Sequence, residues 1–164
     1  MNGYDLAQLN VGRLHAPIDA PATAAFVAAL DPINALADAA PGFLWRLQTE
    51  DGNATAIHVS DDPLFIVNMS VWESLEALAN FVYRSAHTDV MRRRAEWFER
   101  SANAYVVLWW VPRGHRPTVD EAIGRLERLR RDGPTEYGFT FRQPFSPPDS
   151  DADIDVDGGW TCRA

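Results

Sequence analysis

The sequence has little cysteine and no long hydrophobic run. Cys162 is the single cysteine in 164 residues, so no internal disulfide can form, which favours a reducing compartment. No apolar stretch approaches the ~18 residues of a membrane-spanning helix. The N-terminal residues also lack the charged-then-apolar form of a signal peptide. The sequence therefore predicts a cytoplasmic protein that does not enter a membrane.

Clustered positive charge and phosphate-binding loops are missing too. The formal net charge is -8 and the pI about 4.9, whereas a nucleic-acid-binding surface concentrates positive charge. The arginine-rich runs at 92–94 and 128–131 have acids nearby, as in a solvated helix face. No glycine-rich phosphate loop or G-x-S-x-G elbow occurs. We therefore expect no binding of nucleic acid or nucleotide and no serine hydrolase chemistry.

The chain combines one apolar-rich domain with an acidic end. Hydrophobic residues make up 46% of it and six are tryptophans, enough for a real core. We predict a domain over 1–147 and a loosely ordered tail over 148–164, where aspartates alternate with other residues. The tail matches the start of a calcium loop at Asp153, but Ala164 stands where the bidentate glutamate is needed. No metal is expected.

Alternating or β-branched segments predict the strands. They are expected at 4–13, 43–49, 64–72 and 104–111, with shorter candidates at 54–60 and 138–142. In the first strand, Ala7, Leu9 and Val11 share one face, and Leu6, Gln8 and Asn10 share the other. The segment at 104–111 is almost wholly apolar, as in a strand buried on both faces.

Helical periodicity and capping residues predict the helices, expected at 21–39, 74–83, 87–101 and 119–132. Asp19 is the expected cap of the first, and Pro32 should kink or break it at Asp31. Thr118 and Glu121 match a capping box at the start of the last helix. Gly133 should end that helix.

This order of elements predicts an α+β fold with an antiparallel sheet and helices on one face. The opposite sheet face would then be apolar and bare. Packing two such faces together in a two-fold homodimer would cover them, so we expect a homodimer.

Several segments carry a resemblance to a known group. They are LAQLNVGRL at 6–14, PGFLWRLQ at 41–48, SAHTDVMRRRAEWFE at 85–99, VLWWVPRGHRPTVDEAIGRL at 107–126 and GPTEYGFTFRQPF at 133–145. With Trp72-Glu73-Ser74 ahead of His87, they resemble an uncharacterised bacterial family, a domain of unknown function, of the dimeric α/β-barrel superfamily. That superfamily includes antibiotic-biosynthesis and haem-degrading monooxygenases. The resemblance implies a ferredoxin-like subunit, a dimeric α/β barrel and a small pocket between sheet and helices.

His87 is the leading candidate for chemistry. Val90, Met91, Arg94 and Phe98 follow it at helical spacing and share its face. A histidine on such a stripe can act as a general base near neutral pH or as an axial haem ligand. It can also cap its helix or satisfy a buried polar group.

The haem-degrading relatives use an asparagine on the first strand, a tryptophan that ends a middle strand and a histidine on the next helix. Asn10, Trp72 and His87 occupy similar places. His87 follows Trp72 by fifteen residues, a longer insertion than the resemblance implies, and this weighs against haem ligation.

Further substrate contacts are expected from Trp45, Asn68, Met91, Arg94 and Trp110. Arg94 lies on the order of 10 Å from His87 by helical rise. It could hold a carboxylate, a phenolate or a haem propionate, or it could pair with a nearby acid at position 89, 96 or 99. The other histidines are too dispersed for a metal cluster.

The leading functional hypothesis is a monooxygenase-like enzyme acting on an apolar or aromatic, secondary-metabolite-like substrate. His87 would be its base, Asn10 and Asn68 its polar clamps, and Trp45, Trp72 and Trp110 its walls. A haem protein with His87 as axial ligand is one alternative. A ligand-binding or structural dimer without turnover is the other.

Overall fold

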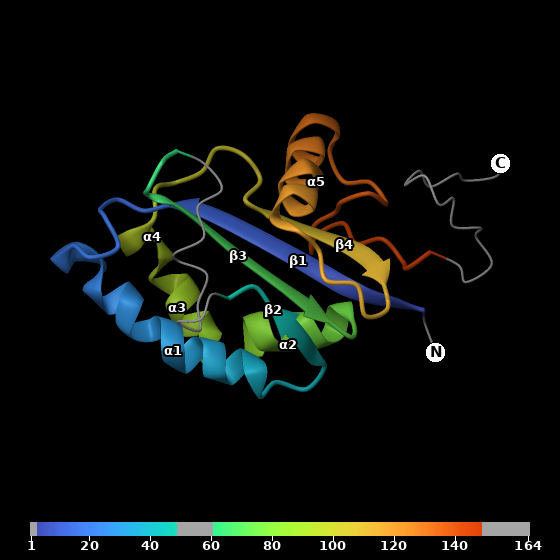
Figure 1. Ribbon diagram of the computed structural model, residues 1–164, viewed down its shortest axis with the longest axis horizontal. Coiled ribbons are helices and arrows are strands. Elements are labelled where there is room, and N and C mark those ends of the chain that lie inside the picture. Colours follow the sequence, from blue (N-terminus) through green and yellow to red (C-terminus); the bar gives the residue numbers. More distant parts are fainter. Residues whose placement is uncertain (1–2, 49–60, 149–164) are drawn as a thin grey trace.

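A four-stranded antiparallel sheet forms the centre of the molecule (Figure 1). The structure is a computed structural model that describes residues 3–48 and 61–148. The strands are β1 (Tyr4–Arg13), β2 (Phe43–Arg46), β3 (Phe65–Trp72) and β4 (Val106–Pro112), in the order β2-β3-β1-β4. This order and the helices between the strands are consistent with a ferredoxin-like α+β fold.

Helices lie on both sides of the sheet. A short 3₁₀ turn, η1 (Pro21–Thr23), leads into α1 (Ala24–Asp38), and the remaining helices are α2 (Leu75–Arg84), α3 (His87–Arg92), α4 (Arg94–Trp97) and α5 (Val119–Asp132). In Figure 1, α1 to α4 lie on one side of the sheet and α5 on the other. The core is correspondingly divided between the two sheet faces.

The predicted bounds of β1 and α5 are confirmed, whereas the other elements differ from their predicted bounds at one or both ends. The helix expected at 87–101 divides at Arg93 into α3 and α4 and ends at Trp97. The segment at 138–142 forms a single bridge, in which Phe139 exchanges backbone hydrogen bonds of 2.8 and 2.9 Å with Leu108. The strand expected at 54–60 and His58, like the tail beyond Pro148 with Cys162, lie outside the described residues.

The start and middle of α1 differ from the prediction. Asp19 does not cap it; the turn is held by the buried hydroxyl of Thr23, which lies 2.7–3.1 Å from three backbone carbonyls at positions 17, 18 and 20. Pro32 does not end the helix. Ala28, whose carbonyl loses its helical partner at Pro32, is exposed, so water can satisfy that carbonyl.

The sequence predicts helices on one face of the sheet only, and the position of α5 contradicts this prediction. Its apolar stripe, Ala122, Leu126 and Leu129, packs on the sheet face that carries Ala7 and Leu9. On that same face the β3 residues Val67, Met69 and Val71 are only 1–2% exposed in the single chain. The bare face that motivated the homodimer is therefore absent from the described residues, and the dimer stays a prediction.

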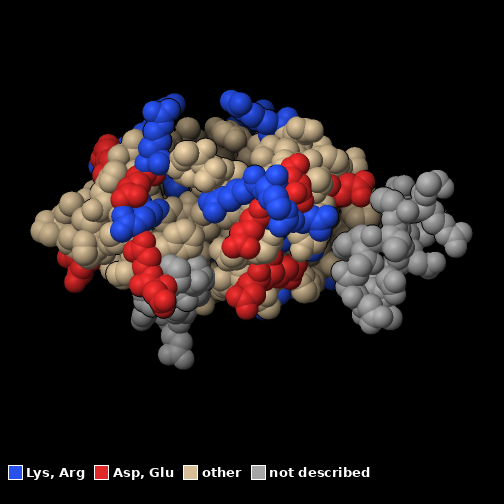
Figure 2. All heavy atoms as spheres, turned by 90° about the horizontal axis from the view of Figure 1, so that it is seen from above, with Lys and Arg blue, Asp and Glu red and all other residues tan. Residues whose placement is uncertain are grey.

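Charges of both signs are interspersed on the molecular face that carries α5 (Figure 2). Arg128 pairs with Asp132 at 3.5 Å and Arg131 with the same carboxylate at 3.0 Å. The arginine-rich run is thus a solvated helix face, as predicted. No helix in the described part of the chain is long and apolar enough to cross a membrane.

The cap of α5 is testable. The Thr118 hydroxyl accepts a hydrogen bond of 3.1 Å from the Glu121 backbone N–H. Thr118→Ala should lower the free energy of unfolding by about 1 kcal/mol, measured by urea denaturation, whereas Thr118→Ser keeps the oxygen and should stay close to wild type. An equal loss in both variants would contradict a capping role.

Candidate functional site

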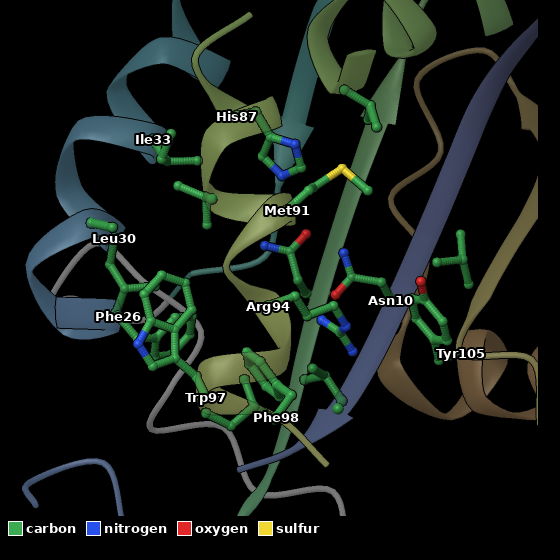
Figure 3. Close-up of a pocket in the computed structure, with 18 of the residues that line it drawn as sticks. Asn10, Phe26, Leu30, Ile33, His87, Met91, Arg94, Trp97, Phe98 and Tyr105 are labelled. Carbon is green, nitrogen blue, oxygen red and sulfur yellow. The ribbon is translucent and has the colours of Figure 1, made fainter. Parts of the chain in front are cut away.

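A cavity of about 230 Å³ lies between the sheet and the helices α1, α3 and α4. Figure 3 shows the side chains that α1 and the α3–α4 segment direct toward the strands. Most of the lining is apolar: Phe26, Leu30 and Ile33 from α1, Ile66 from β3, and Val90, Met91, Trp97 and Phe98 from the 87–98 segment. Such a lining suits a small molecule with a largely apolar body.

Side-chain amides gather on the sheet side of this cavity. Antiparallel pairing sets Asn10 of β1 opposite Asn68 of β3, and Gln8 opposite Ser70. Asn34 of α1 joins them at the cavity wall. Gln8 Oε1 is buried without a hydrogen-bond partner among the described residues. The amides therefore offer donors and acceptors to a ligand.

His87 is the first residue of α3 and its imidazole lines the cavity. The Ser85 hydroxyl accepts a 3.2 Å hydrogen bond from the His87 backbone N–H, and the ring packs on Phe81 with centroids 5.0 Å apart. Burial lowers the pKa of His87 from its ordinary value of 6.5, and the Val82 carbonyl opposes this only in part. Its buried Nδ1 has no hydrogen-bond partner among the described residues. The imidazole is thus neutral at pH 7.

A second cavity, of about 60 Å³, adjoins the first and shares His87 and Asn10 with it. Trp72 lines only this smaller space, where its Nε1 donates a 2.9 Å hydrogen bond to Ser70 Oγ. The predicted trio of Asn10, Trp72 and His87 therefore meets at this smaller space. Asn10 and His87 also line the larger cavity, which Trp72 does not reach, and haem ligation by His87 stays a prediction.

Two of the predicted tryptophan walls lie elsewhere. Trp45 pairs with Val71 and packs in the core on the α5 side of the sheet. Trp110 packs on Phe139, and its Nε1 donates a 2.8 Å hydrogen bond to the Phe145 carbonyl. Neither lines the described cavities. The alternation of strand faces excludes Trp45, and the segment at 139–145 covers Trp110.

Arg94 reaches the cavity from α4 and lies between two aromatic rings, visible in Figure 3. Its guanidinium carbon is 4.5 Å from the centroid of Phe98 and 4.6 Å from that of Tyr105. Its Nη2 donates a 2.9 Å hydrogen bond to the Val11 carbonyl. Burial lowers the pKa of Arg94, and Tyr105 opposes the shift.

The ion pair considered for Arg94 is not formed, because the candidate acids bind other arginines. Asp89 pairs with Arg92, Glu96 with Arg93, and Glu99 with Arg13. Met91 and Asn68, also predicted as contacts, do line the cavity.

The sequence did not indicate that α1 and the 97–105 segment contribute side chains to the site. Helical periodicity places Phe26, Leu30 and Ile33 on one face of α1 without indicating a ligand, and Asn34 and Tyr105 carry no recognisable motif. The two other described histidines do not line the cavities: His115 Nε2 is 3.0 Å from Glu121, and His15 contacts the Ala95 carbonyl. No group of three or more possible metal ligands occurs within 3–48 and 61–148.

Comparison with known proteins gives a family without an assigned activity. A family model described as a domain of unknown function (DUF3291) matches residues 5–155. A solved structure of NE2512, a protein of unknown function from Nitrosomonas europaea, aligns with 14% identity over 72% of this chain and 97% of its own, with a TM-score of 0.43. No curated protein matches.

The lowered pKa of His87 predicts a pH-dependent stability. Below pH 6.5 the unfolded chain takes up a proton that the half-buried imidazole of His87 takes up less readily, so stability is lost as the pH falls. The other titratable or charged groups described around the two cavities are Arg46, Arg94, Tyr83 and Tyr105, none of them a carboxylate.

Urea unfolding between pH 7.5 and 5.5 should therefore show the wild type losing stability relative to His87→Gln. The other histidines are common to both proteins and cancel in the comparison. A difference in stability that is constant with pH would contradict a lowered pKa of His87 in the folded protein.

Gly12 permits the close approach of α4 to β1. A Cβ at this position would lie 2.5 Å from Phe98 Cδ1 and 2.8 Å from Arg94 Nη2. Gly12→Ala should lower the free energy of unfolding by about 1–3 kcal/mol. Gly124→Ala, in α5 with nothing within 4 Å of its Cβ, should raise it by up to about 1 kcal/mol. Tolerance of alanine at position 12 would contradict the packing.

Proposed function

The chain belongs to the DUF3291 family, a domain of unknown function, and from its cavity we propose a monooxygenase-like small-molecule enzyme with an apolar or aromatic substrate. His87 is its general base. The observation that carries the proposal is a half-buried, neutral imidazole on the wall of an apolar cavity that also presents several side-chain amides.

The surroundings of His87 suit proton abstraction. A neutral imidazole can accept a proton at pH 7, and no carboxylate among the described lining residues competes with it. The apolar walls exclude water from a reactive intermediate. Asn10 and Asn68 lie across the paired strands β1 and β3, where their N–H groups can stabilise negative charge on a substrate oxygen.

The proposed reaction starts at a C–H group acidified by a neighbouring carbonyl. His87 takes the proton, the electron pair delocalises onto the carbonyl oxygen, and the amides of Asn10 and Asn68 bind that oxygen. Dioxygen then oxidises the carbanion, so that a methylene group and O₂ become a carbonyl group and water. The substrate supplies the electrons in this scheme.

The base can be tested with 2-tetralone, a neutral bicyclic ketone with an acidic methylene group. In D₂O the wild type should catalyse exchange of its C1 hydrogens, followed by NMR, and should consume oxygen with the same substrate. His87→Gln should lose both by at least about 100-fold, whereas His115→Gln should not change them. The rate should fall with a midpoint below pH 6.5 as the pH decreases, since protonated His87 cannot act.

The other outcomes identify the alternatives. Binding of 2-tetralone without exchange would favour a ligand-binding protein and contradict the catalytic proposal. A saturable Soret band on haem titration that is lost in His87→Ala would favour a haem protein. Absence of binding by 2-tetralone would contradict the cavity as a substrate site.

A further inference from the structure

Arg94 places one positive charge in an otherwise uncharged cavity. It is the one charged side chain among the described residues that line the 230 Å³ space, in a chain whose formal net charge is -8. Of its five N–H groups, one donates to the Val11 carbonyl, and none of the others donates to a described residue. The remaining N–H groups are therefore available to an acceptor in the cavity.

Arg94 has no carboxylate partner among the described residues, unlike the arginines that lie near it. The nearby arginines at positions 13, 92 and 93 all pair with acids, and all three are more than 40% exposed. Arg94 is half-buried, where an unpaired charge is costly. The faces of Phe98 and Tyr105 offset part of that cost. They also hold the guanidinium plane in place, which prepares it for an incoming anion.

The spacing of the polar residues in the cavity indicates the size of the ligand. His87 and Arg94 stand seven residues apart along α3 and α4, about 10 Å by helical rise. Met91 lies between them in Figure 3, and Leu30 and Ile33 of α1 line the same cavity. A body of one or two rings spans this apolar stretch, with its ends at the two polar residues.

We infer that the substrate is an aromatic or alicyclic monocarboxylate whose carboxylate binds Arg94 while its far end contacts His87 and Asn10. This rests on the proposed function, since it assumes that the same cavity holds the substrate. A single guanidinium matches a single negative charge, and its planar N–H fork matches a carboxylate. The amides on the β1 and β3 strands then serve the uncharged end.

Two probes of the same shape test the anchor. They are 4-hydroxyphenylacetate and its uncharged amide, 4-hydroxyphenylacetamide, with binding measured by calorimetry. The wild type should bind the carboxylate at least about tenfold more tightly than the amide. Arg94→Met should lose this preference and keep its affinity for the amide. Arg92→Met, which removes an exposed arginine of the same segment, should keep the preference.

The results separate the two proposals. Equal affinity of the wild type for both probes would overturn the carboxylate anchor and leave the proposed function standing. If neither probe binds and 2-tetralone does not bind either, both the carboxylate anchor and the proposed function are overturned. A preference that survives in Arg94→Met would also overturn the anchor.

A second measurement is made on the wild type, so a folding defect of Arg94→Met does not affect it. In the wild type, the Arg94 Nε–H resonance, assigned by comparison with Arg94→Lys, should shift on addition of 4-hydroxyphenylacetate and stay in place with the amide. An unchanged resonance at saturation with the carboxylate would overturn the assignment.

Discussion

Strand β1 pairs with β3 on one side and β4 on the other, and its hydrogen bonds decide where the polar groups of the site lie. Since side chains alternate across a strand, Gln8 and Asn10 face the cavity while Ala7 and Leu9 face α5. A slip of one residue would exchange the two sets. The apolar packing of α5 on one face therefore holds the amides in place on the other.

The α3–α4 segment completes the site through the spacing of two side chains. His87 starts α3 and Arg94 starts α4, and both contact the cavity. Gly12 of β1 lets Phe98 and Arg94 come close to the sheet, and the Val11 carbonyl orients the guanidinium. One end of the cavity thus carries a neutral imidazole and the other a guanidinium, with apolar walls between them.

Unsatisfied polar groups are concentrated where the cavity lies. Gln8 Oε1 and His87 Nδ1 are buried without partners among the described residues, and Arg125 Nε, over the ring of Tyr137, is the third such atom. Buried polar groups normally find a partner, and violations of that rule tend to occur at functional sites. Two of the three atoms belong to the wall of the proposed substrate site.

Local patterns in the sequence determined β1, α5 and the face that carries Gln8 and Asn10, because alternation and capping act between near neighbours. They also determined that His87, Met91 and Arg94 share one side of a helical segment. Only the tertiary structure decided that α5 packs opposite the other helices, that Trp45 and Trp110 leave the site, and that the nearby acids bind other arginines. Those outcomes depend on strand order and on competition between side chains distant in sequence, which local periodicity does not contain.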